Sequence, residues 1–132
     1  MKAVRLIYLL LPLLLVACHK ENDSETFLQG EEVNLKTGRL YRLGTEDLTI
    51  TVREIQDSRC PVGVYCCWQG EAAVLLDAGN GTDFEVRLST VHHPADTLHH
   101  YIFRLIDVLP YPVYGKDIPD SKKTVILEVR KI

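Results

Sequence analysis

From Phe27 onward, apolar and polar residues alternate in short runs, and no segment keeps apolar residues at helical spacing for three turns. The clearest run places Leu48, Ile50 and Val52 between polar neighbours. A period of two is typical of a β-strand with one buried face. The pattern therefore predicts an all-β domain.

About seven segments of the chain have this strand pattern. The stretch from Ala72 to Leu76 is continuously apolar, which favours a central strand. Asn80-Gly81 is typical of a two-residue type I′ hairpin turn, because both central positions of that turn need positive φ. The other expected strands cover residues 33–35, 40–43, 48–55, 84–88, 101–109 and 125–129, the first two forming a pair around Thr37-Gly38.

The spacing of these strands predicts a sandwich of two antiparallel sheets over residues 27–132, with a small β-barrel as the alternative. The connections are too short for crossover helices, which argues against a parallel α/β fold. A chain of 132 residues has room for one such domain.

The first residues of the chain have a different composition. Lys2 and Arg5 precede an apolar stretch over residues 6–16, which as a helix would span about 16 Å, roughly half of a bilayer core. Such a segment is typical of a secretory signal peptide, which we expect over residues 1–17. Its removal would change the formal net charge from −3 to −5 and leave a polar, flexible tether over residues 18–26.

The end of this segment, Leu15-Val16-Ala17-Cys18, resembles the lipobox of bacterial lipoproteins. The resemblance implies that the chain is cleaved before Cys18 and that the Cys18 thiol is acylated, which would anchor the protein to a membrane. His19 stands where an Asp retains such proteins at the inner membrane, so the resemblance implies the outer membrane. It leaves open whether the domain faces the periplasm or the cell surface.

With Cys18 acylated, three cysteines remain in an oxidising compartment. Adjacent cysteines rarely bridge each other, so we expect Cys60 to pair with Cys66 or Cys67. We favour Cys60–Cys66, which closes the ring CPVGVYC, while the pairing with Cys67 stays open. Either pairing predicts one free thiol, which we expect to react slowly.

The segment DSRCPVGVYCCWQGEA, residues 57–72, resembles a group of exported bacterial proteins, many of them lipoproteins. These proteins share Asp-Ser-Arg-Cys-Pro followed by Cys-x-Trp-x-Gly-Glu-Ala. The group has no established activity, so the resemblance implies no catalytic residue. Its two cysteines correspond to Cys60 and Cys66, and Cys67 departs from its pattern.

The segment closed by this disulfide has two structural interpretations. As a binding loop, it would be ordered in advance of contact with a partner. As a structural plug, it would bury Tyr65 and Trp68 in the core, with Trp68 against the disulfide. Redox chemistry is disfavoured, because no CxxC spacing occurs. The candidate binding residues are Pro61, Val62, Val64, Tyr65 and Trp68.

Four histidines form the second candidate site. His92, His93, His99 and His100 lie within nine residues, and imidazole is a common ligand of Zn and Cu. A loop bent at Pro94 could bring His93 and His99 together in a weak metal site. The alternative is a solvated loop without a ligand.

Catalytic motifs are missing from the sequence: it contains no GxSxG, HExxH or phosphate-binding glycine loop. We expect Asp57, Arg59, Asp77 and Asp83 to cap turns or lie on solvated faces. The acidic net charge argues against a nucleic-acid partner.

The sequence thus predicts a lipid-anchored, non-catalytic binding module of the cell envelope, without a cofactor, for an unknown envelope protein or glycan. The alternatives are a metal-handling lipoprotein that uses the segment from His92 to His100, and a protease inhibitor that uses the loop between Cys60 and Cys66 as bait.

Overall fold

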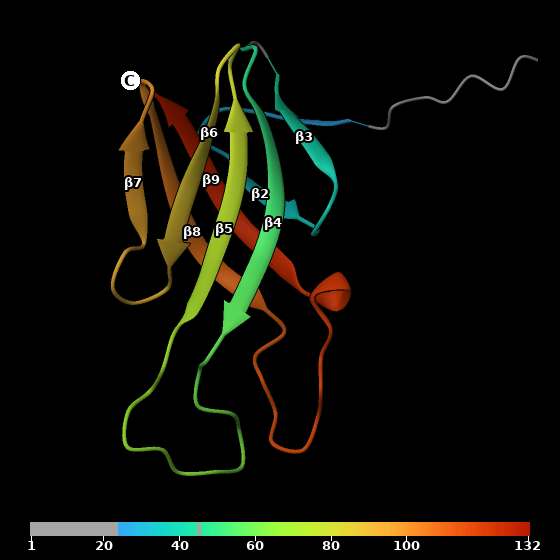
Figure 1. Ribbon diagram of the computed structural model, residues 1–132, viewed down its shortest axis with the longest axis vertical. Helices are drawn as coiled ribbons and strands as arrows, with labels where there is room; N and C mark the ends of the chain where they lie inside the picture. The colour runs from blue at the N-terminus through green and yellow to red at the C-terminus, as the bar shows by residue number, and fades with distance from the viewer. Residues whose placement is uncertain (1–23, 45) are drawn as a thin grey trace, which may run out of the picture.

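The computed structural model describes residues 24–44 and 46–132, which form two β-sheets packed against each other (Figure 1). The first sheet has the strand order β1-β3-β4-β5-β6, and the second has the order β2-β9-β8-β7. Neither sheet closes on itself, so the predicted β-sandwich is confirmed and the barrel alternative is wrong. The strands are β1 (Glu25–Phe27), β2 (Glu32–Leu35), β3 (Leu40–Leu43), β4 (Thr49–Asp57), β5 (Ala72–Gly79), β6 (Asp83–Ser89), β7 (Ala95–Leu98), β8 (Tyr101–Leu109) and β9 (Thr124–Lys131).

Apolar side chains from both sheets form the core between them. In β4, Ile50 and Val52 are buried, and a bulge between Val52 and Glu54 shifts the register so that Ile55 is buried as well. A second bulge, between Leu105 and Asp107, interrupts β8 in the same way. The largest fully buried side chains come from both layers and include Tyr41, Leu35, Leu43, Leu48, Ile50, Leu76, Leu88, Phe103 and Leu127.

The described residues form nine strands, two more than the sequence pattern indicated. One of the additional strands is β7, in the histidine-rich segment. The other is β1, which begins at Glu25, so that the sandwich starts two residues before the expected boundary at Phe27. The predicted signal peptide, Cys18 and most of the predicted tether lie outside the described residues.

The expected pairing of residues 33–35 with residues 40–43 is wrong. Both segments are strands, but β2 pairs with β9 in one sheet and β3 pairs with β4 in the other. The chain between them crosses from one layer to the other, where Gly38 has a φ of 79° and its N–H donates to Val52 O at 3.0 Å. Alternation identifies which face of a strand is buried but does not identify the neighbouring strand.

The turns also differ in part from expectation. Asn80-Gly81 does join β5 and β6 in a hairpin. Because Gly79 pairs with Asp83, however, the turn has three residues rather than the expected two. Of these three residues only Gly81 has positive φ. The two-residue turn with positive φ at both positions is His99-His100, between β7 and β8. Two histidines are an unusual choice for such a turn, and the sequence pattern gave no sign of it.

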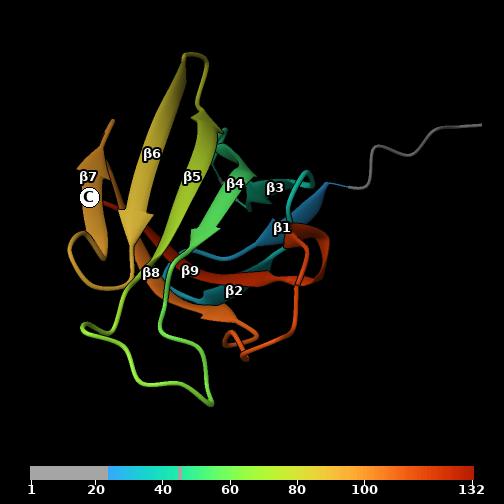
Figure 2. The ribbon, with the colours of Figure 1, turned by 60° about the horizontal axis from the view of Figure 1, so that its bottom comes forward.

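Two long loops meet at one end of the sandwich (Figures 1 and 2). The first, residues 58–71 between β4 and β5, is called the cysteine loop below. The second, residues 110–123 between β8 and β9, is called the β8–β9 loop and contains a single 3₁₀ turn at Asp120–Lys122. Within the described part of the chain, no helix is long and apolar enough to cross a membrane.

Candidate functional site

Backbone hydrogen bonds close the base of the cysteine loop. Ser58 N donates to Glu71 O at 2.9 Å, and Cys60 N donates to Gln69 O at 2.8 Å. The two sides approach so closely at Gly70 that a Cβ atom there would lie 2.0 Å from Ser58 O. Gly70 also has a φ of 69°, so both the close approach and the backbone conformation require glycine.

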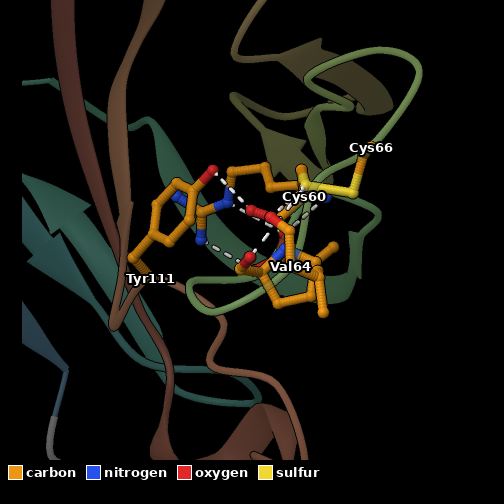
Figure 3. The surroundings of a disulfide bond; sticks show 7 residues. Cys60, Val64, Cys66 and Tyr111 are labelled. Atoms are coloured by element: carbon orange, nitrogen blue, oxygen red, sulfur yellow. Dashed lines mark hydrogen bonds and ion pairs between the residues drawn. A yellow bond between two sulfur atoms is a disulfide. The ribbon is translucent and has the colours of Figure 1, made fainter.

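A disulfide links Cys60 to Cys66 across this loop (Figure 3), with the two Cα atoms 5.9 Å apart. The favoured pairing is therefore confirmed, and among the described residues Cys67 is the free cysteine. Cys67 is exposed, so the expectation of a slowly reacting thiol finds no support in its position. The disulfide fixes the shape of residues 60–66 at the outer end of the domain.

Arg59, which was expected on a solvated surface or at a turn, is instead buried. Its Nε donates to Asp57 Oδ1 at 2.9 Å, and its Nη2 donates to Asp57 Oδ2 at 2.7 Å. Burial would raise the pKa of Asp57, but the hydrogen bonds from the Arg59 side chain and backbone hold that pKa below its ordinary value. The pair is thus ionised and bidentate, and it ties the end of β4 to the cysteine loop.

The same guanidinium group reaches the second loop. Arg59 Nη2 donates to Pro110 O at 3.4 Å, and the Arg59 Cζ atom lies 4.7 Å from the centre of the Tyr111 ring. The Tyr111 hydroxyl in turn donates to Cys60 O at 2.9 Å (Figure 3). The cysteine loop and the β8–β9 loop are therefore joined through Arg59 and Tyr111.

A β-bridge provides a second connection between the loops. Val62 N donates to Pro112 O, and Tyr114 N donates to Val62 O, both at 3.0 Å. Side chain and backbone contacts thus hold two segments together that lie about fifty residues apart in the sequence. We conclude that the loop end is a single ordered structure rather than two independent loops.

Large apolar side chains project outward from this structure. Tyr65 is fully exposed, Tyr114 is 69% exposed and Trp68 is 55% exposed. Of the candidate binding residues, Pro61 and Val64 are half-buried and the other three are exposed. The plug interpretation, which buried Tyr65 and Trp68 in the core, is therefore wrong. The Trp68 ring lies beside the His92 ring, with the two ring centres 5.9 Å apart. We call the following residues the loop-end surface: Val62, Tyr65, Trp68, Tyr111 and Tyr114.

The loop-end surface carries almost no charge. Residues 58–70 and 108–115 include one ionisable residue of the Asp, Glu, Lys and Arg types, Arg59, and its charge is buried against Asp57. Charged residues such as Glu71 and Lys116 flank these segments. An apolar, charge-depleted centre with aromatic residues and a polar rim is the usual anatomy of a protein-binding or ligand-binding surface.

The histidines are not gathered into one site. His92 and His93 precede β7 and His99 and His100 follow it, so the strand separates the two pairs by roughly 20 Å. His92 Nδ1 lies 2.9 Å from Glu71 Oε2, a contact that lowers the pKa of Glu71. The His99 ring stacks on Phe84 with the ring centres 4.2 Å apart. Among the described residues, no group of three or more potential ligands is placed to hold a metal ion.

The residues of this site whose role the sequence did not indicate are Arg59, Tyr111 and Tyr114. Residues 110–112 follow the strand expected over residues 101–109, and nothing in their sequence indicated contact with the cysteine loop. No protein-family model matches this chain, and neither a curated protein nor a solved structure is detectably similar to it. The fold and the site thus define a β-sandwich domain with a disulfide-tied, aromatic loop end.

Proposed function

We propose that this chain is a lipid-anchored lipoprotein of the cell envelope whose sandwich is a binding module. In this proposal Cys18 carries the anchor, and the loop-end surface contacts the partner. The lipobox-like residues before Cys18 support the anchor. The observation that carries the binding role is the group of exposed aromatic side chains on a loop end held by the disulfide and by Arg59.

The position of the chain's first described residues supports this arrangement. Glu25 pairs with Tyr41, and Tyr41 pairs with Ile50, near the start of β4. The cysteine loop follows Asp57, seven residues further along β4, which at about 3.3 Å per residue is roughly 20 Å away. The described chain therefore begins near one end of β4, and the loop-end surface lies beyond the other end of that strand.

The size of the loop-end surface suits a partner of macromolecular dimensions. An aromatic side chain can bury roughly 150–250 Å² in a contact. Four partly or fully exposed aromatic residues and Val62 supply a large part of the ~800 Å² that each partner contributes to a standard interface. Exposed apolar area of this extent is uncommon on a domain without a partner.

The two alternative functions receive less support. The metal-handling alternative needs His93 and His99 close together, and β7 separates them. The inhibitor alternative needs an extended bait segment with free backbone groups. Val62 uses both its N–H and its C=O in the bridge to the β8–β9 loop, and Gly63 has a φ of 103°.

Photocross-linking in intact cells tests the proposal. A benzoyl-phenylalanine at position 65 or 114 should form a discrete adduct, because both side chains project from the loop-end surface. Thr82 is an exposed residue of the hairpin between β5 and β6, at the other end of β5 from the cysteine loop, and the same substitution there provides the matched control. Trp68→Ala should weaken the adduct at position 65. Adducts of equal yield at all three positions, or none at positions 65 and 114, would contradict the proposal.

A further inference from the structure

A pocket of about 140 Å³ opens beside the loop-end surface, between the end of β4 and the β8–β9 loop. Its apolar wall consists of Pro110, Pro112 and Ile118. Tyr111 lies between the two prolines in the sequence, and Tyr114 is two residues before the pocket residue Lys116. The pocket has room for a ligand of about the size of one sugar ring. The Tyr111 ring packs on Arg59, which pairs with the pocket residue Asp57, so this aromatic side chain lies close to the pocket.

The other residues that line the pocket are ionisable, and each of their charges has a neighbouring charge of opposite sign. Asp57 is neutralised by Arg59, with Asp57 Oδ2 and Arg59 Nη2 2.7 Å apart. Lys123 Nζ lies 3.1 Å from Asp120 Oδ1. The last two, Lys116 and Asp117, are adjacent in the chain and of opposite charge. The polar groups of the pocket therefore sum to no net charge, so the pocket as a whole favours neither an anionic nor a cationic ligand.

These groups suit a ligand that both donates and accepts hydrogen bonds. A carboxylate accepts and an ammonium group donates, so hydroxyl groups of a single ligand can satisfy both. An apolar side chain of a protein partner would instead remove water from Lys116 and Asp117 without replacing their hydrogen bonds, which is unfavourable. Sugar rings combine a rim of hydroxyl groups with an apolar C–H face that packs against aromatic rings.

We propose that this pocket binds a neutral sugar residue and that the loop-end tyrosines contact the adjoining part of the glycan. The inference rests on the proposed binding function and specifies its ligand class. The pocket holds the terminal or branching residue through Lys116 and Asp117, with Asp57 Oδ2 as a further acceptor. The exposed aromatic rings extend the contact along the glycan.

Titration of the ¹⁵N-labelled mature lipoprotein with simple sugars tests this inference by NMR. The protein is held in a detergent without a sugar headgroup, because such a headgroup would compete. The probes are glucose, galactose, mannose and N-acetylglucosamine, compared with the charged analogues glucuronate and glucosamine. At least one neutral sugar should bind with millimolar affinity and shift the amide signals of residues 116–118, and its charged counterpart should bind no better.

Variants of the pocket provide the controls. Ile118→Trp fills the pocket and should weaken binding at least tenfold, and Lys116→Ala, which does not add volume, should weaken it several-fold. Lys122→Ala removes an exposed lysine of the neighbouring 3₁₀ turn that does not line the pocket, and it should leave binding unchanged.

Three outcomes would overturn the inference: no shift with any neutral sugar at 50 mM or so, shifts outside the pocket only, or tighter binding of a charged analogue. If the photocross-links at positions 65 and 114 then contain a protein, the glycan inference fails while the proposed binding function stands. If those cross-links are also absent, both fail.

Discussion

Arg59 contacts four parts of the loop end through one guanidinium group. It is paired with Asp57, lies 3.5 Å from Asp107 Oδ1, donates to Pro110 O and packs on Tyr111. This role of Arg59 was not predictable from the sequence, because three of those partners lie about fifty residues away. The pairing of Cys60 with Cys66 was predictable, since it depended on a few neighbouring residues. The exposure of Tyr65 and Trp68 was not predictable, because it depends on how the cysteine loop packs against the rest of the domain.

Replacing Arg59 tests whether its guanidinium group is the buried partner of the Asp57 carboxylate. Arg59→Ala leaves the buried Asp57 carboxylate without a partner, so we expect the free energy of unfolding to fall by about 3 kcal/mol. Arg53, which lies on β4 as Asp57 does, forms exposed ion pairs with Asp77 and Glu85, and Arg53→Ala should have a much smaller effect. Urea unfolding of the mature protein, followed by circular dichroism, measures both. Equal losses for the two variants would mean that Arg59 is not a buried partner of Asp57.

The difference in unfolding free energy between the wild type and Arg59→Ala should depend on pH in a predictable way. Because the folded state lowers the pKa of Asp57, the pair stabilises the fold above the ordinary carboxyl pKa of 3.8. That contribution decreases as the pH falls through the lower folded-state pKa. The difference in stability between the wild type and Arg59→Ala should therefore be constant near neutral pH and shrink in acid. A difference that grows in acid would contradict this linkage.

The strands were largely predictable and their arrangement was not. Alternation located β4, β6 and β8 because each has one buried face, and that face is visible in the sequence. The partner of β2 was predicted wrongly, since it is β9, about ninety residues away. The strand β7 was missed because its short, exposed sequence has no apolar alternation. The loop end was not predictable because it depends on contacts between distant loops.

The disulfide acts on a loop rather than on the core, which predicts a moderate effect on stability. Closing a seven-residue ring removes chain entropy from the unfolded state worth about 2 kcal/mol. We expect the double variant Cys60→Ser, Cys66→Ser to lose up to that amount in urea unfolding and to lose most of the cross-link at position 65. Cys67→Ser provides the matched control and should change neither. A cross-link that survives in the double variant would show that the disulfide does not shape the binding surface.

Considered as one body, the domain has two different ends. The chain enters beside β3, near the start of β4, and the cysteine loop lies beyond the far end of β4 (Figure 2). The strand β1, where the described chain begins, and the proposed binding surface are therefore separated by much of the length of β4. This separation would let the loop end reach a partner while Cys18 stays at the membrane.

The anchor is the premise on which compartment, disulfide formation and orientation all depend, and mass spectrometry of the protein purified from its native cells tests it most directly. We predict a mature chain that begins at Cys18 and carries a diacylglycerol thioether on that residue. An intact chain with residues 1–17 attached and an unmodified Cys18 thiol would contradict the account.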